Sequence, residues 1–326
     1  MEPDETPDIL DSKHIFDEER RSAITSTDVA GILGLSKYST ALSVYQDKIG
    51  ESEPWIPSLP AWLGNRMETI VSELYSEATS NKVRADNRFH RHPQYPWFAC
   101  HLDRRVVGDP GIIVELKTRD RMRGWGDDGS ADIPVDTWTQ VQAQMIITAA
   151  KEVHVATLFG NRSFRVYRIL PDAVFESTLI PELTQFWFEN VLKGIPPPPS
   201  GRAVDTRIVN GMPGGNTGSM KSATPEMEEL VQRLRLARLT TAQAELVEME
   251  AANRVKVLIG DDADGLTGAF GTIAWRRTAE IHKTDWRAIA DELLPTLPGG
   301  MGDALKSQHT VVSPGVRRFE PKFREE

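Results

Sequence analysis

The sequence has one cysteine, Cys100, in 326 residues. A single thiol excludes an intramolecular disulfide, a CxxC zinc site and a four-cysteine iron–sulfur cluster, and it favours a reducing compartment. Long apolar runs are also missing, and the opening MEPDETPDILDSKHIFDEERRS is acidic where a signal peptide would be basic and then apolar. We therefore expect a cytoplasmic protein that has no contact with a membrane.

Positive charge is scarce as well, because 38 Lys and Arg stand against 47 Asp and Glu and give a net charge of −9. This balance excludes a protein that coats nucleic acid by charge alone, but it allows an enzyme with a local basic groove. With 24 Gly, 21 Pro and 40% apolar residues, the chain is neither collagen-like nor low in complexity. At roughly 150 residues per domain, its length predicts two domains.

Helix signals dominate the N-terminal part of the chain, where hydroxyl residues precede short apolar runs and glycines follow them. The pattern predicts one short helix capped near Ser26 and stopped at Gly34, and a second capped by Ser39 and ended at Gly50. Apolar residues at helical spacing predict a longer helix at roughly 61–78.

Short runs rich in aromatic and β-branched residues begin near residue 83 and continue to 118, and they predict strands. Helical spacing returns at 134–150, and two strands are predicted at 152–160 and 163–170 before a helix that ends near 193. Because helices and strands alternate in this mixed order, the sequence predicts an α/β domain with helices packed on a sheet.

Four prolines in GIPPPPSG end this domain, because they can continue neither a helix nor a central strand. A charged helix at roughly 225–258, a strand at GTIAWRRT and a short helix at DWRAIADELL follow. We therefore expect three parts: an α/β domain at 1–195, a Pro/Gly-rich linker at 196–222 and a mainly helical C-terminal accessory region of unknown role at 223–326.

The strongest candidate site combines two acids and a lysine on neighbouring strands. In GIIVELKTR, Glu115 and Lys117 emerge on the same strand face, where burial is costly unless they pair or take part in chemistry. A short connection makes WFACHLDRRV an antiparallel neighbour, which could place Asp103 beside Glu115. Two carboxylates are the usual hard-ligand pair for Mg²⁺ or Mn²⁺, although Glu115 and Lys117 alone could be a chance pair and Asp103 a solvated strand-end residue.

Two further polar side chains could join this site. Glu68, in WLGNRME, lies beside the apolar stripe of its helix and could reach over the sheet, or it could be an ordinary solvated carboxylate. Gln140, in TQVQAQM, could bind a metal-held water or a phosphate through its amide. We interpret Gln142 and Gln144 of the same segment as a solvated face.

The ordered set ITSTDVAGILG, WLGNRME, HLDRRV, IVELKT and TQVQAQM resembles the phage lambda-type exonuclease family, also called YqaJ-like viral recombinases, in the PD-(D/E)xK nuclease superfamily. The likeness covers roughly residues 18–195. It implies a restriction-endonuclease-like core, with a mixed central β-sheet flanked by helices, and a metal-dependent deoxyribonuclease domain at 1–195.

The resemblance also implies roles for individual residues. The family's active-site positions match Glu68, Asp103, Glu115, Lys117 and Gln140. The metal, Mg²⁺ or alternatively Mn²⁺, would be held by Asp103, Glu115 and the carbonyl of Leu116, with Glu68 as a further ligand. Arg20 and Thr27 match the arginine and serine that hold the terminal 5′ phosphate, although Arg21 is adjacent and Thr27 could instead be a simple helix cap.

The family degrades linear double-stranded DNA from a 5′ end and leaves 3′ single strands for an annealing protein in phage-type recombination. The resemblance therefore implies a phage-encoded or prophage protein, a single-strand annealing partner and a homotrimeric ring. The sequence departs from the family pattern at Leu102, where the superfamily has proline, and at Thr137, where an aromatic residue is common. The GTIAWRR segment and the SPGVRRF ending resemble extensions of some phage members.

Local charge agrees with a DNA substrate. Residues 84–123 carry nine Lys and Arg against five Asp and Glu, inside a chain that is acidic overall. The alternatives are an endonuclease of the same superfamily and a non-catalytic DNA-binding or assembly subunit. The presence of both acids and the lysine disfavours the non-catalytic subunit.

Overall fold

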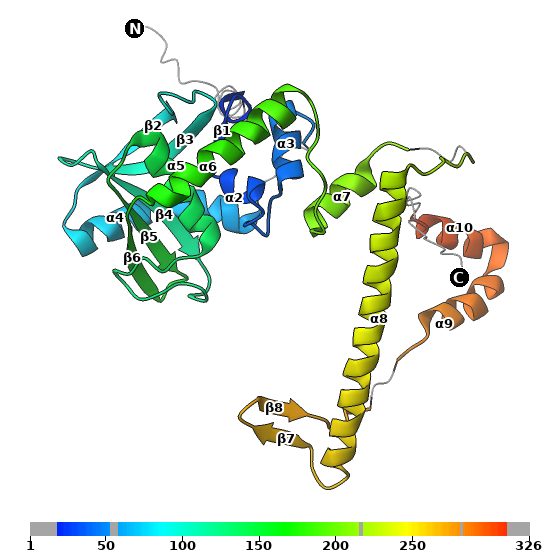
Figure 1. Cartoon of the computed structure of the whole chain (residues 1–326). Helices are drawn as coiled ribbons and strands as arrows, with labels where there is room; N and C mark the ends of the chain where they lie inside the picture. The colour runs from blue at the N-terminus through cyan, green and yellow to red at the C-terminus, as the bar shows by residue number, and fades with distance from the viewer. Residues whose placement is uncertain (1–17, 53–57, 215–217, 281–282, 312–326) are drawn as a thin grey trace. The chain divides into compact units, whose positions relative to one another are not determined.

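The structure is a computed structural model that describes residues 18–52, 58–214, 218–280 and 283–311 (Figure 1). The SPGVRRF ending and residues 215–217 of the expected linker lie outside these ranges. The chain divides into two compact units, Met1–Pro213 and Gly214–Glu326. None of the described helices is both long enough and apolar enough to span a bilayer.

The N-terminal segment contains β1 (Ile24–Thr25), α2 (Val29–Ile32), α3 (Ala41–Ile49) and α4 (Leu59–Thr79). Two predicted caps were wrong, because Asp28 rather than Ser26 occupies the N-cap of α2 and Thr40 rather than Ser39 that of α3.

At α3, Thr40 has the extended backbone of a cap, and its hydroxyl accepts a 3.1 Å hydrogen bond from the Ser43 N–H. The Ser43 hydroxyl accepts in return from the Thr40 N–H at 2.8 Å, which completes a capping box. Gly50 ends the helix with a φ of 77°, a left-handed conformation that glycine adopts without steric cost.

A mixed sheet forms the centre of the first unit. The strand order is β1-β3-β4-β5-β6, with β2 paired to β3. The β3/β4 and β5/β6 pairs are antiparallel, and β4/β5 is parallel. The strands after β1 are β2 (Val83–Arg91), β3 (Phe98–Val106), β4 (Ile112–Arg119), β5 (Glu152–Phe159) and β6 (Ser163–Ile169).

Helices cover both faces of this sheet. Ile113 of β4 shares a buried cluster with Val141 and Met145 of α5 (Val135–Thr148), the crossover between β4 and β5. Val114, the next residue of β4, packs in a second cluster with Tyr75 of α4. Because strand side chains alternate, these clusters lie on opposite faces. The predicted mixed sheet flanked by helices is therefore confirmed.

The first unit continues past the proline segment. α6 (Ala173–Gln185) runs into a π-helical turn, Phe186–Leu192, which confirms the predicted helix to about 193. α7 (Ala203–Gly211) lies inside the range expected to be a linker, and its buried Asp205 accepts hydrogen bonds from Thr40 and from Ser200, the latter at 2.6 Å. These bonds attach α7 to α3.

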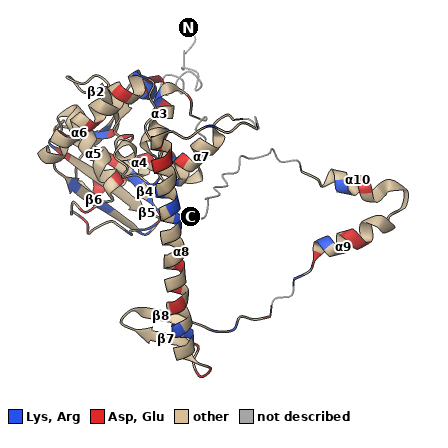
Figure 2. Ribbon diagram, turned by 45° about the vertical axis from the view of Figure 1, so that its right-hand side comes forward, with Lys and Arg blue, Asp and Glu red and all other residues tan. Residues whose placement is uncertain are grey.

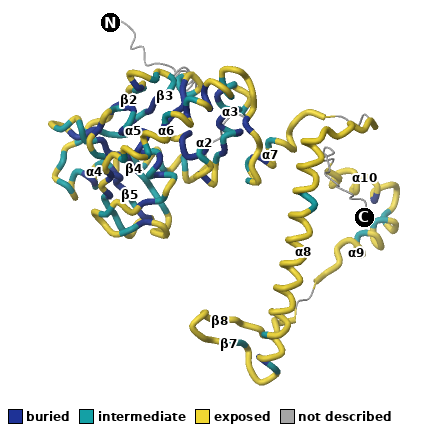
Figure 3. Tube along the Cα trace, in the orientation of Figure 1, coloured by how far each residue is buried: buried dark blue, intermediate teal, exposed yellow. Residues whose placement is uncertain are grey.

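The second unit is mainly helical, as predicted. The 35-residue helix α8 (Pro225–Ile259) is capped by Thr224, carries charges of both signs (Figure 2) and is exposed along most of its length (Figure 3). The remaining elements are the hairpin β7 (Gly265–Gly268) and β8 (Gly271–Ala274), then α9 (Trp286–Leu293), two 3-10 turns (Leu294–Thr296 and Pro298–Gly300) and α10 (Met301–Gln308).

Candidate functional site

The β3/β4 pair brings two acidic side chains together. Arg104 lies opposite Val114 in the antiparallel register, so one further step places Asp103 beside Glu115. The backbone N–H of Leu116 donates a 2.8 Å hydrogen bond to Asp103 Oδ2. Both acids are therefore fixed by strand geometry and not by flexible loops.

Three side chains donate to the buried carboxylate of Glu115. Lys117 Nζ pairs with its Oε1, and Gln140 Nε2 donates to the same oxygen at 2.7 Å. Gln144 Nε2 donates to Oε2 at 2.7 Å. Lys117 also donates to Gln140 Oε1 at 3.0 Å, which closes a ring of contacts between β4 and α5.

The prediction that Gln142 and Gln144 lie on a solvated face was wrong, because both side chains are buried. Each retains only 1% of its exposed surface. Gln142 donates to the Leu170 carbonyl at 2.8 Å and accepts from the Asp172 N–H at 3.0 Å. Gln144 lies one helical turn after Gln140. This spacing could have predicted that the two amides contact the same carboxylate.

Electrostatics single out Asp103 within this cluster. Its burial and the charge of Glu115 raise the pKa of Asp103 to about 7, although Lys117 and the Leu116 N–H favour its charged form. A pair of adjacent carboxylates with one raised pKa is typical of sites that hold a proton or a cation.

Glu68 lies on the α4 side of the sheet. Its Oε2 is 3.8 Å from Arg104 Nη1, and its side chain is 40% exposed. Burial raises the pKa of Glu68, and its charge contributes to the raised pKa of Asp103. Glu68 is thus within electrostatic reach of the acids without a hydrogen bond to them.

The donor set suits one hard divalent cation. Hydrogen bonds among the described residues use Asp103 Oδ2 and fill Glu115 Oε1, but they leave acceptor capacity on Asp103 Oδ1 and Glu115 Oε2. Carboxylate oxygens are the ligands that Mg²⁺ and Mn²⁺ prefer. Within the described ranges, no group of three or more His, Cys, Asp or Glu could hold an ion. A backbone carbonyl and water would therefore have to complete the coordination.

Comparison with known proteins places this geometry in a family. Residues 16–151, which include every residue of the cluster, match the YqaJ-like viral recombinase domain. The chain carries a YqaJ-like viral recombinase domain. For residues 16–151, this confirms the YqaJ-like family predicted from the ordered motifs.

Relatives are similar over different parts of the chain. The uncharacterized protein YqaJ of Bacillus subtilis (strain 168) is 25% identical over 282 residues, covering 84% of this chain and 86% of the relative. An alkaline exonuclease from Laribacter hongkongensis superposes with a TM-score of 0.47 at 15% identity, over 56% of this chain and 94% of that one. A phage-related exonuclease from Haemophilus somnus 129PT gives 0.41 at 7% identity, over 55% and 99%.

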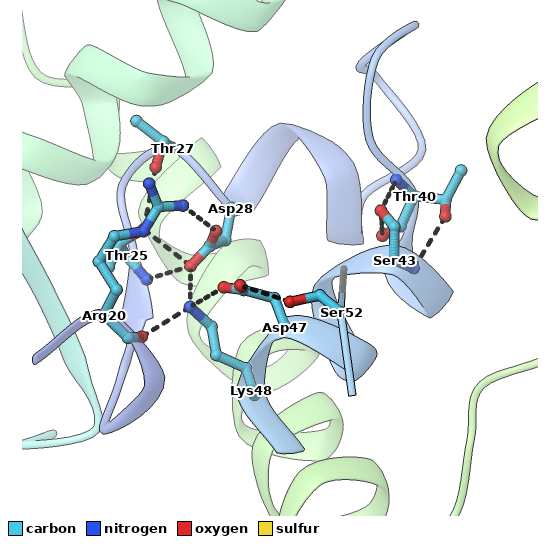
Figure 4. Close-up of polar contacts among 9 residues, drawn as sticks. All are labelled: Arg20, Thr25, Thr27, Asp28, Thr40, Ser43, Asp47, Lys48 and Ser52. Carbon is cyan, nitrogen blue, oxygen red and sulfur yellow. Dashed lines mark hydrogen bonds and ion pairs between the residues drawn. The ribbon is translucent and has the colours of Figure 1, made fainter. Parts of the chain in front are cut away.

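A second polar cluster of the YqaJ-like domain surrounds Arg20 (Figure 4). Lys48 has a fully buried side chain and pairs with Asp28 Oδ2 at 2.6 Å. It also donates to the backbone carbonyl of Arg20 at 2.8 Å, while Arg20 Nη2 lies 3.8 Å from Asp28 Oδ1. Burial raises the pKa of Asp28, but Lys48 and Arg20 more than offset this and lower it overall. Arg20 is therefore held at both its backbone and its guanidinium.

Thr27 lies in the same cluster with an exposed side chain. Its hydroxyl is 2.9 Å from that of Thr25, and Asp28 rather than Thr27 stands at the N-cap of α2. The structure therefore does not support Thr27 as a simple helix cap. Asp28 and Lys48 were not predicted as site residues, because nothing in the local sequence pattern pairs two residues twenty positions apart.

The basic stretch of residues 84–123 is only partly available to a substrate. Arg105 Nε and Arg88 Nε each lie 3.0 Å from the carboxylate of the buried Asp86. Arg91 donates to the Pro96 carbonyl and to the Ser22 hydroxyl. These arginines have structural partners in addition to any nucleic acid.

Proposed function

We propose that this YqaJ-like protein is a divalent-metal-dependent exonuclease that resects linear double-stranded DNA from a 5′ end. The observation that supports it most is the buried Glu115, held by Lys117, Gln140 and Gln144 beside Asp103. Two adjacent acids, a lysine and an amide provide cation ligands and a positive group for phosphate in one place.

Asp103, Glu115 and the carbonyl of Leu116 would hold Mg²⁺, or Mn²⁺ in its place, and water would complete the coordination. Glu68 would have to move toward the two acids to become a further ligand. Such an ion supplies charge neutralisation and water activation when it is bound. Lys117 would stabilise negative charge on the phosphate being cleaved, because it is a cation that pairs with Glu115 and whose charge also acts on Asp103. Gln140 would orient the phosphate or the attacking water through its amide.

Arg20 and Thr27 would bind the terminal 5′ phosphate. A guanidinium donates two parallel hydrogen bonds to a phosphate, and a nearby exposed hydroxyl can add a third. Thr25 pairs with Ala99 of β3, the strand that also carries Asp103. Asp103 lies four steps along the strand from Ala99, a distance of about 13 Å, so both clusters could contact one DNA end.

The products would be 3′ single strands for a single-strand annealing protein of a phage-type recombination system in the bacterial cytoplasm. The protein would form a homotrimeric ring around the DNA. The accessory region from residue 223 onward would serve assembly, partner docking or guidance of the DNA end.

Digestion of a linear duplex labelled at its 5′ or 3′ end, beside a covalently closed circle, tests this function. We expect Mg²⁺-dependent release of nucleotides from the 5′ end only, no cutting of the circle and no activity in EDTA. Cutting of the circle would favour the endonuclease. Binding of DNA without any cleavage would favour a non-catalytic DNA-binding or assembly subunit.

Arg20→Ala and Arg21→Ala separate the two candidate arginines for the terminal phosphate. We expect Arg20→Ala to abolish the preference for 5′-phosphorylated over 5′-hydroxyl duplexes. Arg21→Ala should keep it, because Arg21 is exposed and, of the two arginines, Arg20 is the one that contacts the buried Lys48–Asp28 pair. The opposite pattern would assign the phosphate to Arg21.

A further inference from the structure

A basic cavity lies at the C-terminal end of α5, with a volume of about 640 Å³. Its lining includes Arg84 and Arg88 of β2, Arg105 of β3, and Ile146 and Ile147 of α5. The wall thus joins guanidinium groups to an apolar surface. None of these residues belongs to the acid cluster or to the Arg20 cluster.

A buried carboxylate holds two of the arginines in place. Asp86 accepts from Arg88 Nε and from Arg105 Nε, each at 3.0 Å, and His90 Nε2 lies 3.0 Å from the same carboxylate without hydrogen-bond alignment. Burial raises the pKa of Asp86, but the hydrogen bonds from the arginines lower it overall to well below the usual range. Asp86 therefore stays ionised, and the two guanidiniums exceed it by one positive charge.

Two further groups on the wall can donate to an anion. His92 Nδ1 accepts from the Gln94 and Tyr95 N–H groups, both at 3.1 Å, so the neutral ring carries its proton on Nε2. Arg84 makes no side-chain hydrogen bond or ion pair with any residue that the structure describes. Its whole guanidinium is therefore available.

The charge on the lining is strongly positive. Four arginines, including Arg91, stand against one carboxylate, Glu176, and the buried Asp86 behind the wall removes one more positive charge. An ordered set of donors next to aliphatic side chains suits a ligand with an anionic end and an apolar or aromatic body. A volume of this size suits one small-molecule unit.

We infer that this cavity is a second nucleic-acid site, which binds a phosphate group and the attached nucleoside of a DNA strand. Thr148, which lines the cavity, lies about 12 Å from Gln140 along the axis of α5. That distance corresponds to roughly three or four nucleotides of a strand. The inference rests on the proposed function for its substrate, but not on cleavage.

Binding of short DNA to the full-length Lys117→Ala protein in EDTA tests the inference without catalysis. We would compare Arg84→Glu with Lys82→Glu, a matched reversal of charge at an exposed residue just before β2 that does not line the cavity. The probes are a fluorescent 12-nucleotide single strand and the corresponding duplex, each titrated over a range of salt concentrations.

Arg84→Glu should weaken the binding of at least one probe about tenfold more than Lys82→Glu does. The affinity of the Arg84→Glu protein for that probe should also depend less steeply on salt concentration. A single-strand effect alone would assign the site to the resected strand, and an effect on both probes to the duplex. Equal affinities for the two variants on both probes would overturn the inference. The inference would also be overturned if Arg84→Glu weakened binding of a poly-glutamate peptide but of neither DNA probe.

The cleavage assay separates this result from the proposed function. If the wild-type protein digests from the 5′ end and the two variants bind DNA equally, the second site alone is rejected. A second variant, His92→Leu, removes a donor from the wall without a charge change, and it should weaken the same probe as Arg84→Glu.

Discussion

The two units of the chain differ in what they bury. The first unit buries whole charged side chains, among them Lys48, Asp86 and Glu115, whereas Ile259 and Gly302 are the buried residues of the second unit within the part that the structure describes (Figure 3). Burial of a charge is costly unless it is paired or used. The contrast indicates that chemistry should be sought in the first unit, because among the described residues the buried charges lie there.

Within the first unit, the buried charges are of two kinds. Asp205 attaches α7 to α3 and Asp86 orders the arginines of β2 and β3, so both have structural partners. Glu115 instead gathers Lys117, Gln140 and Gln144 beside a second acid whose pKa is raised.

The largest expected effect is on catalysis. Asp103→Asn removes one of the two adjacent carboxylates but keeps the acceptor for the Leu116 N–H. We expect digestion of linear duplex to fall about 10³-fold, near the upper end for loss of one electrostatic group in an active site. The measurement is the single-turnover rate in Mg²⁺, and a fall of less than tenfold would contradict a metal-binding role.

Lys48→Met should destabilise the fold by about 3 kcal/mol, because it leaves Asp28 buried without its closest cation. Urea unfolding monitored by circular dichroism measures the loss. The double variant Asp28→Asn/Lys48→Met removes both charges and should recover at least half of it. Equal stability of the single and double variants would show that the pair is not the origin of the effect.

The raised pKa of Asp103 predicts a pH dependence of stability in EDTA. The folded state holds this proton up to a pKa of about 7, whereas the unfolded state releases it near 3.8. The contribution to stability is therefore complete at low pH, and it is lost as pH rises toward 7.

Relative to Asp103→Asn, the wild type should lose about 2 kcal/mol between pH 5.5 and 7, since each pKa unit corresponds to about 1.4 kcal/mol. The difference should then be constant above pH 7. The free energy of unfolding of both proteins across this range is the measurement. A parallel pH dependence of the two proteins would be inconsistent with a raised pKa at Asp103.

Gln144→Leu should lower kcat about tenfold, because Glu115 Oε2 loses the donor that orients it. Gln142→Leu is the matched control, since Gln142 bonds to the backbone at Leu170 and Asp172 and not to Glu115. It should reduce stability but leave kcat unchanged. Equal kcat for the two variants would remove Gln144 from the site.

Truncation at the boundary between the two units should have the smallest effect. A chain ending at Pro213 should unfold within about 1 kcal/mol of the first unit in the full protein, because the boundary between the units lies there. A chain ending at Arg202 lacks Asp205 and should lose about 2 kcal/mol through its unmade hydrogen bonds. Equal stability of both truncations would mean that α7 is not part of the first unit.

The sequence predicted most elements of the first unit because burial there imposes regular periodicities. It also predicted that Asp103 and Glu115 would be neighbours, since both follow from strand alternation and a short antiparallel connection. It assigned Gln144 to solvent because a polar residue on a helix usually faces water, and only the tertiary structure shows the carboxylate that makes its burial favourable.

Pairings between distant segments could not be predicted. The Asp28–Lys48 pair, the Asp86–Arg105 pair and the Thr40–Asp205 bond each depend on how separate elements pack. The helix α7 was missed for a related reason, because its stability depends on contacts with α3 and not on its own short sequence.

The rate at which wild type and Lys117→Ala digest one 5′-phosphorylated linear duplex in Mg²⁺ tests whether the cluster around Glu115 is the catalytic centre. Circular dichroism of both proteins would confirm that the variant is folded. We expect digestion to fall by at least about 10²-fold in Lys117→Ala, with DNA binding retained. Digestion at the wild-type rate by folded Lys117→Ala would contradict it, because the cluster around Glu115 would then not be the catalytic centre.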